Sequence, residues 1–143
     1  MKEAILGNQT EKQRNPGKPS DALTSPPPGF SSQIEAFSAK GLDIGEFLVP
    51  RPMTTFYFRS GNDAMVHAGI HTGDLLVVDT SLETASGRII LAVVEGSFLV
   101  RRLQKRSGRL FLTPENDTYA EIEITGRDDV ELRGVVTSAV KTF

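Results

Sequence analysis

From Thr54 onward the sequence consists of short β-type runs separated by turn residues, and this pattern constrains the fold more than any other feature. Each run is rich in aromatic or β-branched residues, and residues typical of turns lie between neighbouring runs. The runs are Thr54–Arg59, Asp74–Asp79, Arg88–Val94, Ser97–Gln104, Arg109–Thr113, Ala120–Thr125 and Asp129–Val140. Closely spaced short strands with almost no helix predict a mainly β domain, built as a curled β-sheet or half-open barrel.

One short helix is expected before these strands. Asp43 and Glu46 have the spacing of a capping box, in which two side chains satisfy free backbone N–H groups at a helix start. Three apolar residues then fall on one helical face: Ile44, Phe47 and Leu48. Pro50 cannot continue a helix, so we expect the helix to end before it.

The first 28 residues differ in composition from the rest of the chain. They hold five of the eight prolines and few apolar residues, so they cannot bury enough surface to offset the entropy lost on ordering. We therefore expect a flexible proline-rich arm over residues 1–28, extended where its prolines are consecutive, and a folded domain over residues 29–143.

Composition excludes several classes of function. The chain has no cysteine, which rules out a disulfide scaffold, a thiol nucleophile and a zinc–cysteine site. The net charge of −2 provides no overall field that would attract nucleic acid or an anionic membrane. The longest apolar run is far shorter than the roughly 20 residues that span a bilayer, and no signal-peptide core is visible. We expect a cytoplasmic protein without a membrane anchor, a cofactor or a metal.

Four short motifs follow one another along the chain. They are Asn62-Asp63-Ala64-Met65, Gly69-Ile70-His71-Thr72-Gly73-Asp74-Leu75-Leu76-Val77-Val78, Val100-Arg101-Arg102-Leu103 and Leu112-Thr113-Pro114-Glu115-Asn116. This series resembles the LexA/UmuD superfamily of self-cleaving serine peptidases. It is closest to UmuD, a DNA polymerase V subunit that acts in SOS mutagenesis with a Y-family polymerase.

The resemblance implies a Ser–Lys dyad, in which an unprotonated lysine activates a serine that attacks a peptide bond in the N-terminal arm. Carried over by motif, the nucleophile position is Ala64, the general-base position is Arg101, and the cleavage site is the Pro28–Gly29 bond. All three positions depart from the family. Alanine has no nucleophilic atom, a guanidinium stays protonated and cannot accept a proton, and Pro28 fixes the backbone beside the bond.

Self-cleavage is therefore expected to be absent. The sequence favours a catalytically inactive, uncleavable UmuD-like protein that acts by dimerisation and protein interaction in the SOS response and error-prone translesion DNA synthesis. The alternative is a RecA-stimulated Ser–Lys autoprotease whose serine was replaced by Ala64 to trap the uncleaved form. Arg101 and the consecutive prolines serve no trapping purpose, which favours the first hypothesis. A LexA-type repressor is disfavoured, because a 28-residue proline-rich arm is too short for a helix-turn-helix domain.

Partners follow from the same resemblance. We expect a homodimer through the exposed edge of Val135–Val140, with a heterodimer with a UmuD-type protein as a further possibility. A UmuC-like Y-family polymerase and the RecA filament are the other expected partners. Arg101 is expected to point into the former catalytic cleft and to pair there with Asp63, Glu95 or the arm.

Two features have ordinary structural interpretations. Basic residues cluster around one hairpin, and a solvated strand face is favoured for them over direct DNA contact: Arg101, Arg102, Lys105, Arg106 and Arg109. His67 and His71 are four residues apart, as metal ligands on a helix would be, but the surrounding glycines indicate a loop, so a metal site is not expected.

Overall fold

The computed structural model describes residues 41–143 of the chain. The chain divides after Pro50, and residues Arg51–Phe143 form one unit. Before that division only residues 41–50 are described. The expected arm (1–28), the start of the domain at Gly29 and the Pro28–Gly29 bond all lie outside the described residues.

The predicted short helix is present as α3 (Ile44–Leu48). Asp43 is its N-cap, and the Asp43 carboxylate accepts a hydrogen bond from the Glu46 N–H at 3.2 Å. The Val49 N–H donates to the Gly45 carbonyl at 2.9 Å and closes the last turn. Cap and stop signals thus give the observed bounds. None of the helices in the described residues is long and apolar enough to cross a membrane.

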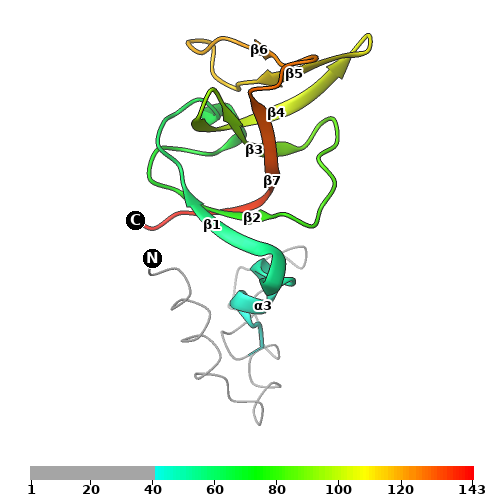
Figure 1. Cartoon of the computed structure of the whole chain (residues 1–143). Helices are drawn as coiled ribbons and strands as arrows, with labels where there is room; N and C mark the ends of the chain where they lie inside the picture. The colour runs from blue at the N-terminus through cyan, green and yellow to red at the C-terminus, as the bar shows by residue number, and fades with distance from the viewer. Residues whose placement is uncertain (1–40) are drawn as a thin grey trace, which may run out of the picture. The chain divides into compact units, whose positions relative to one another are not determined.

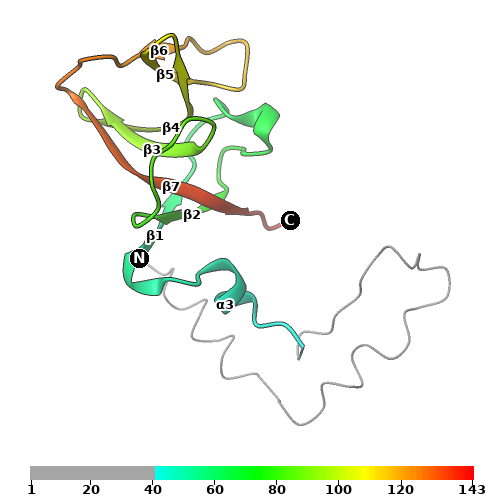
Figure 2. The ribbon, with the colours of Figure 1, turned by 90° about the vertical axis from the view of Figure 1, so that its right-hand side faces the viewer.

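The strands form one antiparallel sheet with the order β1-β2-β7-β3-β4-β5-β6. Their bounds are β1 Thr55–Arg59, β2 Leu75–Asp79, β3 Ile89–Val94, β4 Ser97–Arg106, β5 Arg109–Thr113, β6 Ile122–Glu123 and β7 Val130–Val140. Figures 1 and 2 show the sheet curling, with β7 between the β1–β2 pair and the strands β3 to β6. The mainly β curled sheet predicted from the sequence is confirmed.

Two strands differ from their expected bounds by more than one residue. The strand β4 continues to Arg106, because Ser107 (φ 52°) and Gly108 (φ 76°) form a two-residue hairpin turn that keeps the strand paired with β5 up to the turn. The strand expected over Ala120–Thr125 shrinks to β6, because only Phe111 and Leu112 of β5 pair with it.

Strand β7 changes partners in the middle of its length. Its residues Val130–Val135 pair with β3, and its residues Val135–Val140 pair with β2. Each ladder contains an irregularity at which β7 carries one extra residue. This residue is Arg133 in the ladder with β3 and Thr137 in the ladder with β2. One edge of Val135–Val140 is therefore occupied by β2. In the part of the chain that the structure describes, the opposite edge of residues 136–140 has no strand partner.

The core consists of two apolar clusters on the two faces of the sheet. Ile90 and Ala92 belong to one cluster and Leu91 to the other, as expected for alternating residues of a strand. Close packing at the centre requires a glycine, because a Cβ on Gly134 would lie 2.8 Å from the Val78 Cγ1 atom. At the rim Phe98 is 52% exposed, and its ring centroid lies 5.7 Å from that of Phe58.

Candidate functional site

Ala64 lies in the connection between β1 and β2, and its surface is fully buried. The Ala64 N–H donates to the Asn62 side-chain oxygen at 2.9 Å. The Ala64 carbonyl accepts from the Glu115 N–H at 2.8 Å, and the Glu115 carbonyl accepts from the His67 N–H at 2.9 Å. The segment is thus fixed by backbone bonds to the loop that follows β5. At its centre this segment presents a methyl group and no nucleophilic atom.

The nearest upstream hydroxyl belongs to Ser60, which is also buried. The Ser60 hydroxyl donates to the Asn62 carbonyl at 3.2 Å. The Ser60 N–H donates to the Asp74 carbonyl at 2.8 Å, so the residue is held in the turn that connects β1 to the next strand. These contacts give Ser60 a local structural role.

Arg101 lies in β4, directly opposite Ile90 of β3, and only 6% of the residue surface is exposed. The Arg101 Nη1 atom donates to the Val100 carbonyl at 2.8 Å. The guanidinium carbon lies 5.5 Å from the centroid of the Tyr119 ring. The Nε atom is buried and has no hydrogen-bond partner among residues 41–143. Arg101 is therefore a buried cation whose contacts are a neutral carbonyl and an aromatic ring.

Burial lowers the pKa of the Arg101 guanidinium from its ordinary value, and its attraction to Tyr119 raises that pKa in part. A guanidinium still remains protonated at neutral pH after such a shift. The side chain at position 101 is therefore a fixed positive charge and cannot accept a proton.

The expected pairing of Arg101 with Asp63 or Glu95 is wrong. The Asp63 carboxylate accepts from both the N–H and the hydroxyl of Thr72, each at 2.9 Å, and so closes a turn. Glu95 pairs with Arg127 at 3.0 Å on the exposed side of the β3–β4 turn. Both carboxylates satisfy neighbours in their own loops. The third expected partner, the arm, lies outside the described residues.

The loop Glu115–Tyr119 contacts both family positions. At its start, Glu115 forms the backbone bonds to the Ala64 segment, and the Asn116 side chain donates to the Asp63 carbonyl at 2.8 Å. At its end, the ring of Tyr119 lies against Arg101. Positions 64 and 101 are thus linked through one loop. The Leu-x-Pro-x-Asn motif marks the start of this loop in the sequence, but no local pattern marks Tyr119 at its end.

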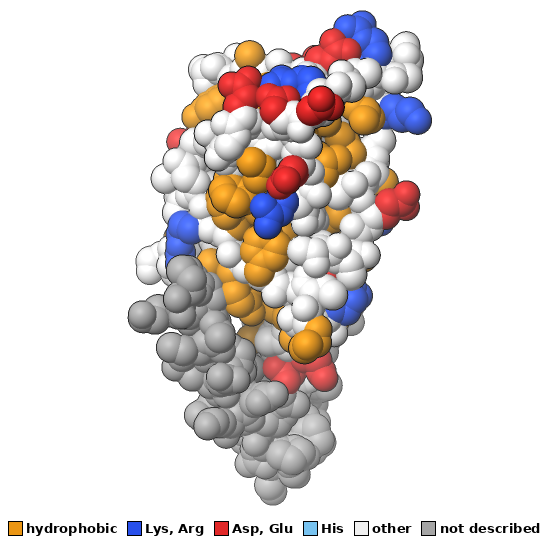
Figure 3. Space-filling model, viewed as in Figure 1, with side chains coloured by type: hydrophobic (Ala, Val, Ile, Leu, Met, Phe, Trp, Pro, Cys, Tyr) orange, Lys and Arg blue, Asp and Glu red, His pale blue; other side chains and the backbone are white. Residues whose placement is uncertain are grey.

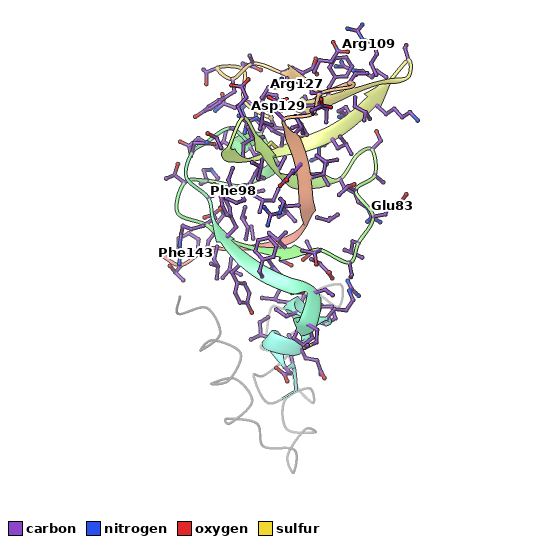
Figure 4. The ribbon with its side chains drawn as sticks, viewed as in Figure 1. Glu83, Phe98, Arg109, Arg127, Asp129 and Phe143 are labelled. Carbon is purple, nitrogen blue, oxygen red and sulfur yellow. The ribbon has the colours of Figure 1, made fainter. Side chains whose placement is uncertain are left out.

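Most of the basic hairpin residues have acidic partners. Arg102 pairs with Glu115 and also donates to the Gly87 carbonyl at 2.7 Å. Two more arginines form 2.6 Å ion pairs, Arg106 with Glu121 and Arg109 with Glu123. Figure 4 places Arg109 at the hairpin end of β4 and β5, and Figure 3 shows acidic and basic side chains interspersed at that end. This mixed surface supports the solvated-face interpretation over a phosphate-binding one.

His71 lies beside a cation. Its Nδ1 atom is 3.0 Å from the Lys141 Nζ atom, and Lys141 also pairs with Asp74. Burial raises the pKa of Asp74, but hydrogen bonds from the His71 N–H and Lys141 outweigh this effect and lower it overall. Within residues 41–143, no group of three or more His, Asp or Glu side chains is arranged to hold a metal ion.

Comparisons with known proteins cover the region that contains these positions. The family model described as Peptidase S24-like matches residues 28–137. Protein SamA of Salmonella typhimurium is 34% identical over 114 residues, which covers 80% of this chain and 79% of SamA. Protein MucA of Escherichia coli is 34% identical over 113 residues, covering 78% and 77%. The LexA repressor of Bordetella parapertussis is 37% identical over 79 residues, covering 55% of this chain and 37% of the repressor.

The extent of these matches decides the family. The family model spans most of the chain, and the relatives SamA and MucA are matched over more than two thirds of their own length. The sheet described above agrees with the LexA/UmuD-like fold that the motifs implied. The chain therefore belongs to the Peptidase S24-like family, in the LexA/UmuD superfamily, and its relatives there are UmuD-like.

Proposed function

We propose that this chain is a catalytically inactive, uncleavable UmuD-like protein that acts through dimerisation and protein interaction in the SOS response and error-prone translesion DNA synthesis. The observation that carries the proposal is the pair of side chains at the two dyad positions. Ala64 is a fully buried methyl, and Arg101 is a buried cation. Neither side chain can perform the step that the family's chemistry requires.

The chemical reason is the proton balance of the dyad reaction. A serine hydroxyl must give its proton to a neutral amine while its oxygen attacks the carbonyl carbon of the scissile bond. Burial suits a lysine to this task, because it lowers the lysine pKa towards neutrality. The same burial cannot make Arg101 a base, and Ala64 supplies no oxygen. Pro28 adds a third obstacle, since it restricts the backbone beside the bond.

Without catalysis, the remaining function of such a domain is interaction. The edge of residues 136–140 that lies opposite β2 supports a homodimer by strand addition between two copies. Pairing with a UmuD-type protein would use the same edge. A UmuC-like Y-family polymerase and the RecA filament are the further partners that the family suggests, in the cytoplasm.

Stepwise restoration of the dyad tests the proposal. The Ala64→Ser variant and the Ala64→Ser/Arg101→Lys double variant would be incubated with an activated recombinase filament, and intact mass spectrometry would search for a fragment that begins at Gly29. We expect no cleavage in the parent chain or the single variant, because Arg101 cannot act as the base. Cleavage of the single variant would overturn the proposal and support a trapped autoprotease instead.

A second measurement tests the interaction half of the proposal. Sedimentation equilibrium of the full chain should show a dimer, and replacing Thr137 by proline should shift it towards monomer. Thr137 is exposed and is the extra residue of its ladder, so this change removes a backbone donor where β7 is already irregular. A monomeric parent chain at all concentrations would contradict dimerisation.

A further inference from the structure

Among the arginines of the described part of the chain, Arg101 stands apart because its side chain is buried and is not paired with a carboxylate. Six arginines there form ion pairs with acidic side chains: Arg51, Arg102, Arg106, Arg109, Arg127 and Arg133. The side chains of these six are 28% to 59% exposed. Arg101 is 6% exposed as a residue and forms no ion pair with any side chain of residues 41–143. The arginine that water screens least is thus the one whose charge the sheet leaves uncompensated.

The geometry around the guanidinium shows which of its hydrogen-bonding positions is unused. A guanidinium has five N–H donors in a planar fork. The contacts of Arg101 are one bond to the Val100 carbonyl and the face of the Tyr119 ring. The Nε–H is buried and has no acceptor in the part of the chain that the structure describes. A buried donor without an acceptor is strongly unfavourable, and a buried charge without a counter-charge is more so.

We infer that Arg101 is a binding site for a single carboxylate, which takes the unused Nε–H of the guanidinium. Arginine binds carboxylates through two parallel N–H bonds, and Nε is one of the two nitrogens that commonly form such a pair. The inference rests on the proposed function in one respect: position 101 must carry a fixed cation and not a base. It turns the former general-base position into a receptor for an acidic group.

Charge balance selects a carboxylate over a phosphate. One guanidinium matches one negative charge. The adjacent Arg102 is already held by Glu115, so it offers no second free cation for a dianion. Tyr119 belongs to the loop that also binds the Ala64 segment, so a ligand at Arg101 would contact the same loop that fixes position 64.

The carboxylate can come from two sources. Residues 1–40 contain four acidic side chains: Glu3, Glu11, Asp21 and Glu35. A separate molecule that presents a carboxylate is the other source. Asp117 is exposed and precedes Tyr119 by two residues, so it must be tested as a source within the described loop.

The experiment follows the Arg101 Nε–H directly by NMR on the full chain labelled with 15N-arginine. The signal is assigned by its loss in Arg101→Lys. Arg59 is the matched control, because its side chain donates to the Gly73 carbonyl at 3.0 Å and is exposed. Backbone amide spectra verify that each variant is folded. The probes are the amide variants Glu3→Gln, Glu11→Gln, Asp21→Asn, Glu35→Gln and Asp117→Asn, and titration with sodium acetate against sodium chloride at equal ionic strength.

Two results support the inference. If one variant within residues 1–40 moves the Arg101 signal upfield and leaves Arg59 unchanged, the carboxylate belongs to this chain. If none does, acetate should produce a saturable shift at Arg101, at least about tenfold tighter than any shift at Arg59. A response to Asp117→Asn would overturn the inference, because the loop would then already neutralise Arg101. No response to any probe would overturn it as well.

The same samples separate this inference from the proposed function. A fragment beginning at Gly29 in the mass spectrum would defeat the proposed inactivity without moving the Arg101 signal. An unresponsive Arg101 signal in an uncleaved chain would defeat the carboxylate site alone.

Discussion

Arg101 and Arg102 are adjacent in β4, yet their charges have different surroundings. Arg102 lies opposite Ile89 and reaches Glu115 and the Gly87 carbonyl. Arg101 lies opposite Ile90, is more deeply buried, and contacts a neutral carbonyl and a ring. Because successive residues of a strand face opposite sides, the two side chains meet different neighbours, and among the described residues only Arg102 meets a carboxylate. Arg102 thus joins two loops through its charge, whereas the charge at position 101 has no acidic partner within residues 41–143.

Replacing each arginine by lysine should give the largest difference between the two positions, and the quantity that differs is the rate of cleavage. In a Pro28→Ala/Ala64→Ser background, Arg101→Lys should raise the rate of cleavage before Gly29 by at least about a thousandfold, because it supplies a buried amine that can lose its proton. Arg102→Lys in the same background is the matched control and should have no effect. Mass spectrometry during incubation with a recombinase filament measures both rates. Equal rates would show that position 101 is not the base position.

Asp79 contrasts with Arg101, because its buried charge is hydrogen-bonded by the side chains and backbone around it. The Asp79 carboxylate accepts from Arg51 Nε at 2.6 Å, from the Thr54 hydroxyl at 2.9 Å, and from the Ser81 N–H and hydroxyl at 2.9 and 2.7 Å. Burial raises the pKa of Asp79, but these bonds outweigh it and hold the pKa well below its ordinary value.

Asp79→Asn should lower the melting temperature by roughly 10 °C at neutral pH. The amide oxygen can keep the bonds from Thr54 and Ser81, but an NH2 group in place of Oδ2 cannot accept from Arg51 and removes its counter-charge. A carboxylate with a lowered folded-state pKa stabilises the fold above the unfolded-state pKa of about 4, and this contribution is lost as the pH falls further. The difference between parent and variant should therefore shrink in acid. Thermal unfolding followed at a series of pH values checks this, and a difference that grows in acid would contradict it.

Removing the charge of Arg101 and removing the charge of Arg102 should change the free energy of unfolding in opposite directions. Arg101→Met replaces an uncompensated buried cation with an apolar side chain and should raise the free energy of unfolding by about 1 kcal/mol. Arg102→Met leaves Glu115 without its cation and should lower the free energy of unfolding. Urea unfolding at neutral pH measures both. A loss of stability in Arg101→Met would contradict the interpretation that the charge at position 101 is uncompensated.

The smallest expected effect concerns the ion pair itself. Arg102 and Glu115 are 28% and 27% exposed, so water and salt partly screen their attraction. A double-mutant cycle with Arg102→Met and Glu115→Gln should give a coupling of about 0.5 kcal/mol that falls at high salt. A coupling that salt leaves unchanged would mean that the pair is held mainly by its backbone contacts.

Local signals predicted most of the fold. The capping box at Asp43 predicted α3, and alternation with turn residues predicted the strands within a few residues of their observed ends. The partner exchange of β7 could not be predicted, because its neighbours β2 and β3 lie far from it in the sequence and no local pattern encodes the exchange. The extra residues at Arg133 and Thr137 arise from the same long-range pairing.

The surroundings of the dyad positions were predicted less well. Motif spacing predicts positions 64 and 101, but the sequence does not identify the partners of Arg101, because the loops that hold Asp63 and Glu95 are placed by long-range pairing. In the structure Asp63 turns to Thr72, and the ring beside Arg101 comes from Tyr119, which is separated from it by the β4–β5 hairpin. Side-chain partners across a sheet depend on strand register, which the sequence alone does not specify.

The two ladders of β7 also have a consequence for how the domain is made. Strands β1 and β2 pair with each other, and β3 to β6 pair in sequence, so both groups are complete before Val130 is translated. In the described part of the chain, no strand ladder joins these two groups until β7 is made; their other contacts are the backbone bonds of Glu115 to the Ala64 segment and the shared apolar packing. Nascent chains should therefore carry two groups of strands with open edges that no ladder yet joins, and full protection from proteases should arrive in one late step.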